Sequence, residues 1–441
     1  MRKRTRAGRV AGVALGVLLG VPGNLGAQGA PVVGVYRVDA DRHVIVRGTA
    51  PDDLSILDGG TGQVRNLTPG AGGEYTHGPT RSLRTPATGR VVFEPGGRLT
   101  WTRDELGTLS GRRLESDRRE IVVGARDGGR IQGELLLPAG SRPHPVVVVV
   151  PLGDRQSLWE PAMWLRAAGI GVLVYDQRGS GRSSGTLFGA SGNSHTLETL
   201  QLADDAVAVV RHARRLPGVD PGRIGILGWS QGGWIAAMAA SRLDGLAFCV
   251  NIAANANPWP EQAEHRFLAR LQREGFEDDA LAEAGAYFQA LRAVSDFRIG
   301  WQAYTDVRER YEEEAWYRTL VSIFPFFVWE DYGDAVRGWS VETSPEVFFR
   351  RLSGVPTLGV YFEFDQSNPP DSPRRFRRAV EEAGNASVDV RTFPGTNHGA
   401  WVVDGYAFDP EGIERRDPAV FAFVASWVTR HVGSGARRDP L

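Results

Sequence analysis

The chain has 441 residues, of which 42% are hydrophobic and 23% charged, and its formal net charge at pH 7 is −1. That length accommodates one large domain with appendages, and the nearly balanced charge gives no support for a nucleic-acid partner. Lys3 is the only lysine, which excludes enzymes that depend on a Walker-A, kinase or Schiff-base lysine further along the chain. The eight histidines and one cysteine show no metal-ligand spacing, so we expect neither a metal nor a cofactor.

Residues 1–27 have the features of a secretory signal peptide. Five basic residues precede an apolar run at residues 10–21, and a stretch of small residues ends at Ala27. The run is too short to span a bilayer comfortably. We therefore expect cleavage after Ala27 and a secreted or periplasmic protein without a membrane anchor. Its net charge becomes −6, because the segment removes five basic and no acidic residues from a chain of charge −1.

Residues 31–115 are expected to form a small β-rich N-terminal domain, in which short β-prone runs alternate with glycine-rich turns. The runs are residues 32–38, 43–48 and 90–93, and the turns are residues 58–62 and 69–73. The more polar stretch 101–117 is interpreted as a connector, with a short helix opening at residues 103–105. No catalytic arrangement is recognisable here, so a structural role is favoured over ligand binding.

Between residues 118 and 435 strands and helices alternate. Five consecutive valines at residues 146–150 are typical of a strand buried on both faces. The expected strands are residues 120–125, 131–137, 146–150, 171–175, 224–227, 246–251, 357–362 and 387–393, and the expected helices are residues 158–168, 196–216, 233–240, 373–383 and 418–431. This alternation predicts an α/β fold with a doubly wound, mostly parallel sheet. Cys249 is expected in a buried strand of that sheet.

The alternation stops between residues 258 and 349. This stretch is helical in pattern and rich in aromatic residues, and an insertion of that kind between two strands indicates a helical cap over an active site. Most of its aromatic side chains are expected to form the core of the cap. Residues 324–329 are the candidate wall of an acyl pocket.

The stretch 223–240 combines a short apolar strand, the G-x-S-x-G turn 228–232 and a helix of small residues. This is the pattern of a nucleophile elbow, in which glycines let the helix cross close to the strand and the serine projects above the sheet edge. Ser230 is therefore the candidate nucleophile. The N–H of Gln231 points into the same space and is a candidate oxyanion-hole donor.

A serine hydroxyl needs a general base at neutral pH, and the base needs an acid to orient it. Asp365 and His398 are the candidate acid and base, because each follows a predicted strand and the order serine, acid, histidine suits such a sheet. Their loops leave the carboxyl ends of strands, as Ser230 does. Glu363 competes with Asp365 but lies closer to the strand end, and Asp404 is a further alternative.

Two more loops belong to this edge of the sheet. The loop after the valine strand is expected to supply the second oxyanion-hole donor, from the N–H of Gly153 or Leu152. The glycine-rich loop 176–185 departs from the spacing of a phosphate cradle. It is interpreted as a tight turn in which Arg178 makes an internal ion pair.

Over residues 118–435 the chain resembles the α/β-hydrolase superfamily. The resemblance rests on residues 176–183 (DQRGSGRS), residues 219–225 (VDPGRIG), residues 228–233 (GWSQGG), Asp365 and the pair His398-Gly399. It looks most like exported bacterial esterases and serine-aminopeptidase-like hydrolases with a β-rich N-terminal domain. The resemblance implies acyl transfer to water through an acyl-enzyme on Ser230. One departure is Pro151-Leu152, where such proteins often carry a His-Gly pair.

Three functions remain open. The favoured one is a carboxylesterase acting on small to medium, mostly apolar esters, with the serine, acid and histidine as a catalytic triad. The second is an exported peptidase of the aminopeptidase or dipeptidyl-peptidase kind, for which Glu312–Glu314 would hold the substrate amine, although a solvated helix face explains that acidic run more simply. The third is a catalytically inactive binding protein, suggested by Pro151-Leu152.

Overall fold

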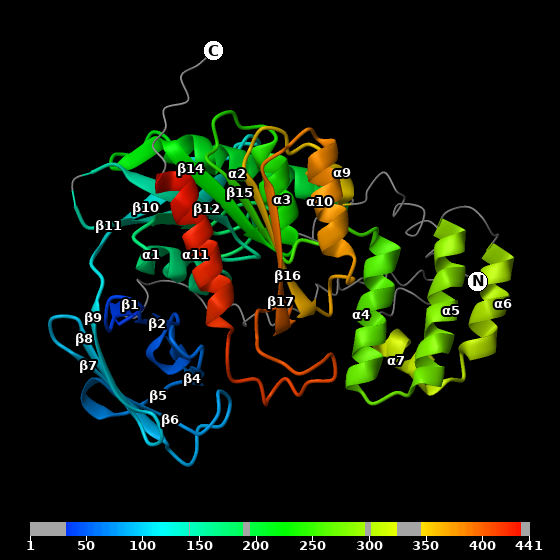
Figure 1. Cartoon of the computed structure of the whole chain (residues 1–441), viewed down its shortest axis with the longest axis horizontal. Helices are drawn as coiled ribbons and strands as arrows, with labels where there is room; N and C mark the ends of the chain where they lie inside the picture. The colour runs from blue at the N-terminus through cyan, green and yellow to red at the C-terminus, as the bar shows by residue number, and fades with distance from the viewer. Residues whose placement is uncertain (1–31, 141, 188–194, 296–300, 324–344, 434–441) are drawn as a thin grey trace, which may run out of the picture.

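The computed structural model describes residues 32–140, 142–187, 195–295, 301–323 and 345–433. They form an antiparallel N-terminal sheet, a mostly parallel central sheet and the helices that flank it (Figure 1). This architecture confirms the predicted α/β fold class, with a helical insertion and a β-rich N-terminal part. The domain boundaries, 31–115 and 118–435, stay predictions, and the predicted signal peptide lies outside the described residues.

The N-terminal sheet has nine strands in the order β4-β3-β2-β1-β9-β8-β7-β6-β5, with antiparallel neighbours throughout. The strands are β1 (Gly34–Arg37), β2 (His43–Arg47), β3 (Ser55–Asp58), β4 (Val64–Asn66), β5 (Thr68–Pro69), β6 (Glu74–His77), β7 (Gly89–Glu94), β8 (Arg98–Arg103) and β9 (Gly107–Arg113).

The interpretation of residues 101–117 as a connector with a short helix is wrong. This stretch contains the end of β8, all of β9 and the turn between them. Trp101 pairs with Leu109 across the hairpin and is fully buried. Arg103, also buried, forms an ion pair with Asp58 at 2.8 Å. The polar composition hid the strand because one inward-facing side chain is an arginine whose charge is balanced inside the sheet.

The central sheet has eight strands in the order β10-β11-β13-β12-β14-β15-β16-β17. The first three strands of this order pair antiparallel, and the pairs from β13 to β17 are parallel. The strands are β10 (Ser116–Gly124), β11 (Arg130–Pro138), β12 (His144–Val150), β13 (Gly171–Tyr175), β14 (Val219–Trp229), β15 (Cys249–Ile252), β16 (Thr357–Phe364) and β17 (Val388–Asn397). Cys249 is buried in β15, as predicted.

The helices cover both faces of the central sheet. They are α1 (Trp159–Ala167), α2 (His195–Ala213), α3 (Gln231–Ala240), α9 (Glu346–Phe349), α10 (Ser372–Glu382) and α11 (Pro418–Gly433). Successive side chains of a strand point to opposite faces. Val146 and Val148 therefore pack into the core with α2, α3 and α10, whereas Val147 and Val149 pack into the core with α1 and α11. The core that contains Val147 and Val149 continues into the N-terminal sheet.

Four of the described helices between β15 and β16 stand beside β16 and β17, on the side away from the N-terminal sheet (Figure 1). They are α4 (Trp259–Arg273), α5 (Asp278–Ser295), α6 (Trp301–Tyr311) and α7 (Ala315–Ile323). Phe267, Tyr287, Phe288, Trp316 and Tyr317 lie in a hydrophobic core separate from those of the sheets. These aromatic side chains thus form the core of the insertion, as predicted, while the candidate acyl-pocket wall at 324–329 lies outside the described residues.

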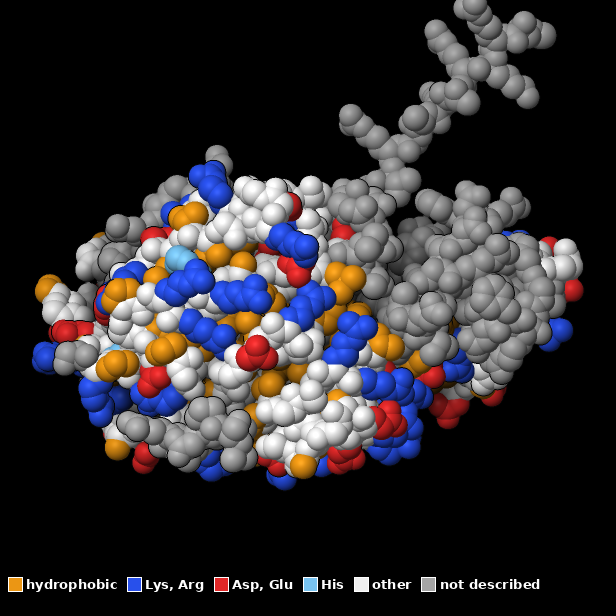
Figure 2. All heavy atoms as spheres, turned by 90° about the horizontal axis from the view of Figure 1, so that it is seen from above, with side chains coloured by type: hydrophobic (Ala, Val, Ile, Leu, Met, Phe, Trp, Pro, Cys, Tyr) orange, Lys and Arg blue, Asp and Glu red, His pale blue; other side chains and the backbone are white. Residues whose placement is uncertain are grey.

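Within the described ranges no helix is long and apolar enough to cross a membrane. On the face seen in Figure 2, basic side chains are scattered among hydrophobic and uncharged ones. Because Lys3 is the only lysine of the chain, every basic side chain in the described ranges, histidine aside, is an arginine.

Candidate active site

Ser230 lies between β14 and α3 in the strained backbone conformation that an elbow requires. Its φ is 53° and its ψ is −126°, a region that side-chain-bearing residues rarely occupy. A Cβ on Gly228 would overlap the carbonyl oxygen of Gly232, so the helix crosses the strand at a distance that only glycine permits. The N–H of Ser230 donates to the carbonyl of Ile252 at 2.7 Å, which fixes the turn to the neighbouring strand.

Asp365 and His398 lie on the loops that follow β16 and β17, and the structure brings them together. His398 Nδ1 lies 2.8 Å from Asp365 Oδ1 and 2.9 Å from Oδ2. The carboxylate is buried and also accepts hydrogen bonds from the N–H groups of Ser367 and Asn368 and from Asn368 Nδ2 at 2.7–3.0 Å. A buried carboxylate with this many donors is held in one orientation toward the imidazole.

The backbone of His398 is tied to the elbow strand. Trp229, the residue before Ser230, donates its indole N–H to the carbonyl of His398 at 3.0 Å. His398, Asp365 and Ser230 therefore lie along one edge of the central sheet. With Nδ1–H donating to Asp365, the neutral imidazole has its unprotonated Nε2 available as an acceptor.

The two alternative acids are engaged elsewhere or exposed. Glu363 accepts the N–H of Gly395 at 2.8 Å, and its exposed carboxylate is not bonded to the histidine. Asp404 is exposed on the loop that follows His398. Among the three carboxylates considered from sequence, the structure pairs Asp365 with the imidazole.

The oxyanion-hole candidates lie at the start of α3 and on the loop after β12. Gln231 is the first residue of α3. The N–H of Leu152 already donates to Ser157 Oγ at 3.0 Å. Gly153 has φ 106°, a conformation suited to glycine, and no described group accepts its N–H. This geometry favours Gly153 over Leu152 as the second donor.

Two residues beside the acid were not found from sequence. Asn368 donates its side-chain N–H to Asp365 Oδ2, and the pattern of an aspartate followed by a serine two residues on and an asparagine three residues on is the available signal. His265 of α4 lies with Nε2 2.6 Å from the carbonyl oxygen of Asp365. No local motif marks His265, because only the packing of the insertion against the sheet brings it there.

The glycine-rich loop 176–185 has its own carboxylate in its centre. Asp176 accepts the N–H of Arg182 at 3.0 Å and pairs with Arg155 at 2.8 Å. Arg178 pairs with Asp205 and with Asp127, both at 2.7 Å. The predicted internal ion pair of Arg178 is therefore confirmed, and a carboxylate occupies the space that a cradled phosphate would need.

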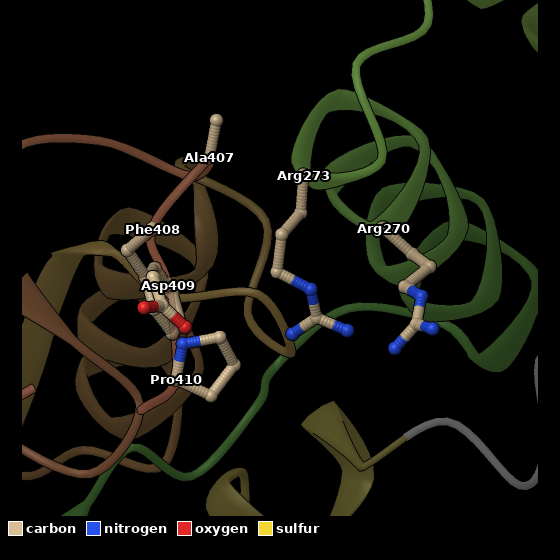
Figure 3. A pocket seen from close by; sticks show the side chains of 6 residues that line it. All are labelled: Arg270, Arg273, Ala407, Phe408, Asp409 and Pro410. Carbon is tan, nitrogen blue, oxygen red and sulfur yellow. The ribbon is translucent and has the colours of Figure 1, made fainter. Parts of the chain in front are cut away.

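A cavity of about 520 Å³ lies between α4 and the loop after His398 (Figure 3), and Ser230 is not among the residues that line it. Arg270 and Arg273 line one side, and residues 407–410 line the other. The described part of the chain contains no cluster of His, Cys, Asp or Glu side chains suited to a metal ion.

A family model described as the alpha/beta hydrolase family matches residues 135–413. The uncharacterized protein YfhR of Salmonella typhimurium is 27% identical over 123 residues, which are 27% of this chain and 39% of that protein. The matched segment thus covers well under two thirds of the length of that relative.

Two solved structures illustrate the similarity to known proteins. The α/β hydrolase GrgF from Penicillium sp. sh18 is 17% identical, with a TM-score of 0.44 over 72% of this chain and 99% of that chain. The Pyrococcus furiosus esterase Pf2001 is 14% identical, with a TM-score of 0.39 over 73% of this chain and 89% of that chain. At these values neither structure indicates what this chain acts on.

Proposed function

The chain belongs to the alpha/beta hydrolase family, and on that premise we propose that it is a serine hydrolase that cleaves carboxylic esters through an acyl-enzyme on Ser230. Membership of the family implies a small-molecule substrate. The observation that carries the proposal is the 2.8 Å contact between His398 and a buried Asp365, on the same sheet edge as a serine with φ 53°. A nucleophilic serine requires a strained turn that presents its hydroxyl, a base held in one orientation, and a buried acid that holds that base.

In the proposed reaction the Ser230 hydroxyl attacks the ester carbonyl carbon while His398 Nε2 takes its proton. The N–H groups of Gln231 and Gly153 stabilise the oxyanion, and the intermediate collapses when the alcohol leaves with the proton from His398. Water then attacks the acyl-enzyme and gives a proton to His398, which returns it to the serine as the carboxylic acid leaves. The Asp365 carboxylate stabilises the imidazolium in both steps.

Esters are favoured over peptides because no specific observation among the described residues supports an anchor for a substrate amine. The acidic residues Glu312–Glu314 are all exposed, and Glu313 pairs with Arg318 at 3.1 Å. These glutamates lie in the turn between α6 and α7, so the interpretation of this run as a helix face is wrong, and the run is a solvent-exposed turn. The inactive-protein alternative rests on Pro151-Leu152, and the Leu152 N–H bond to Ser157 keeps that loop ordered without a His-Gly pair.

We also propose that the protein is exported, with residues 1–27 removed as a signal peptide. The charge and hydropathy of that segment motivate the proposal. N-terminal sequencing of the protein recovered from the periplasm or medium of an expressing bacterium should begin at Gln28. A product that retains Met1 in the cytoplasm would contradict it.

The test of the activity is hydrolysis of p-nitrophenyl esters from acetate to dodecanoate by the mature protein and by Ser230→Ala. We expect turnover that peaks at one chain length and is lost in the variant, together with fluorophosphonate labelling that requires Ser230. Labelling without ester turnover would shift the assignment to another acyl bond. Absence of both would refute a functional triad and leave the binding-protein alternative.

A further inference from the structure

The segment between His398 and α11 lies against the N-terminal sheet. The N–H of Arg416 donates to the carbonyl of Gly62, and the N–H of Val64 donates to the carbonyl of Glu414, both at 2.9 Å. Gln63 and Arg415 form an antiparallel bridge between these two bonds. Residues 414–416 thus extend the turn between β3 and β4 as an added stretch of strand, and Figure 1 shows this segment passing beside β4.

Side chains reinforce the backbone contact. Arg65 pairs with Glu414 at 3.1 Å. Arg81, on the loop after β6, donates to the carbonyl oxygens of Ile413 at 3.1 Å and Pro410 at 3.0 Å. The N-terminal sheet therefore holds the segment by backbone and arginine bonds spread over residues 410–416.

One buried ion-pair network connects this contact to the histidine itself. Glu160 of α1 is buried and pairs with Arg416 at 2.9 Å and with Arg47 of β2 at 3.1 Å. The guanidinium of Arg416 also donates to the carbonyl oxygen of Gly399 and lies 4.0 Å from the centre of the Trp401 ring. Glu160 and Arg416 thus link the N-terminal sheet to the residue next to His398.

The charges of this network are retained at neutral pH. Burial acts to raise the pKa of Glu160, but the charges of Arg416 and Arg47 outweigh burial and lower that pKa. Burial lowers the pKa of Arg416 to about 10, which leaves the guanidinium protonated. A buried carboxylate between two guanidinium groups is costly to break from either side, because removal of a partner leaves an uncompensated charge.

The turn that carries His398 is also restrained by backbone bonds: the N–H of Ala400 donates to the carbonyl of Asn397, and the N–H of Asp417 donates to the carbonyl of Ala400, both at 2.8 Å. Asn397 Oδ1 accepts the N–H groups of Gly399 at 3.0 Å and Trp401 at 3.2 Å, and Ala400 has φ 56°. On the inner side, Trp229 holds the carbonyl of His398. Arg416 holds the next carbonyl along, that of Gly399, so two successive peptide groups after the proposed base are bonded to different parts of the fold.

We propose that Arg416, held by Glu160 and by Arg47 of the N-terminal sheet, is a positioning residue for the general base His398. The N-terminal sheet is then part of the apparatus that orients the base, through the bonds it makes to the segment 410–416. This inference rests on the proposed function, because it assigns the base role to His398. Arg416 acts through the backbone of Gly399 and does not touch the substrate.

The experiment compares the mature chain with Arg416→Gln, Arg416→Lys and Arg47→Gln, using the best p-nitrophenyl ester and the rate of fluorophosphonate labelling. Arg415→Gln is the matched control, because Arg415 is the adjacent residue and its side chain is exposed. Displacement of a catalytic group by about 1 Å can cost on the order of a hundredfold in rate. We expect Arg416→Gln to lower kcat and the labelling rate by about ten- to a hundredfold with KM within about twofold.

The other variants separate positioning from folding. A lysine keeps the charge beside Glu160 but lacks the fork that also reaches the Gly399 carbonyl, so Arg416→Lys should recover part of the lost kcat. Arg47 is partly exposed, and Arg47→Gln should fold and lose about two- to fivefold in kcat. The control should match wild type. If Arg416→Gln does not fold, these two variants decide the question.

Three outcomes would overturn the inference. They are wild-type kcat and labelling in a folded Arg416→Gln, a rise in KM with kcat unchanged, and an equal loss in the Arg415→Gln control. A wild-type protein that neither hydrolyses esters nor reacts with fluorophosphonate would instead refute the proposed function, and the inference would fall with it. Activity in the wild type with no effect of the network variants refutes the inference alone.

Discussion

Replacement of Asp365 by asparagine removes the charge opposite His398 while keeping the size of the side chain. Oδ1 accepts three donors, from Ser367, Asn368 and His398, whereas Oδ2 accepts Asn368 Nδ2 and His398. The new amide is therefore expected to keep its oxygen at the Oδ1 position and its NH₂ group at the Oδ2 position. The imidazole then retains an acceptor for Nδ1–H, but the negative charge that stabilises the imidazolium is lost.

The two consequences have different sizes. At the Oδ2 position the new NH₂ meets the donor Nδ2 of Asn368, and an unsatisfied buried donor costs about 1–3 kcal/mol. Because Asn368 Oδ1 has no hydrogen-bond partner among the described residues, a flip of that amide would restore a bond, so we expect about 1 kcal/mol of lost stability. Loss of the charge should lower kcat by about 10²- to 10⁴-fold, equivalent to roughly 3–5 kcal/mol.

The assay is p-nitrophenyl ester hydrolysis under saturating substrate, with circular dichroism and thermal unfolding to establish that the variant is folded. Glu363→Gln is the control, because that exposed carboxylate bonds to Gly395 and not to the histidine. It should retain kcat within about threefold of wild type, since no interaction with the imidazole is removed. A folded Asp365→Asn variant with kcat within tenfold of wild type, or a control that loses as much, would refute the assignment of the acid.

Three further predictions concern packing and burial. Gly228→Ala places a methyl group against the backbone oxygen of Gly232, so it should lower the free energy of unfolding by at least about 1–3 kcal/mol, seen as a lower melting temperature. The control Gly285→Ala, in α5, has open space around the new methyl group and should raise the stability by up to about 1 kcal/mol. Arg178→Gln leaves the buried carboxylate of Asp205 unpaired and should lower the free energy of unfolding in urea by about 3–5 kcal/mol. A loss below about 1 kcal/mol would contradict the burial of the Arg178–Asp205 pair. Burial raises the pKa of Cys249 to about 12, so iodoacetamide at pH 8 should label the unfolded but not the native protein, and rapid native labelling would show that β15 is accessible.

The central sheet was predictable because its signals are local. The inner strands β12, β13 and β15 are short, mostly apolar runs, and the valines of β12 are buried on both faces, which leaves no polar position among them to obscure the pattern. The elbow is equally local, since Gly228, Ser230 and Gly232 are set by the close crossing of one strand and one helix. The mostly parallel pairing follows from the alternation of strand and helix, whereas the order of the strands comes from the structure.

The N-terminal sheet was only partly predictable because its polar side chains are satisfied by partners far along the chain. Asp58 is fully buried and accepts bonds from Arg42 and from Arg103, which is 45 residues away. In a short stretch of sequence, an aspartate and an arginine are both expected at the surface. Both residues are compatible with a strand interior only because they form this pair. The local sequence does not reveal the pair, and for that reason residues 101–117 were interpreted as a connector.

The sequence by itself determined the elbow, the chain order of Ser230, Asp365 and His398, and the predominantly parallel sheet, because each depends on a short pattern or on the succession of strands. Only the tertiary structure decided which carboxylate faces the histidine, that Leu152 N–H is already bonded, and that Glu160 and Arg416 connect the N-terminal sheet to the histidine turn. Those contacts join residues that are tens to hundreds of positions apart. Their partners are chosen by the packing of whole elements, and no local pattern records that choice.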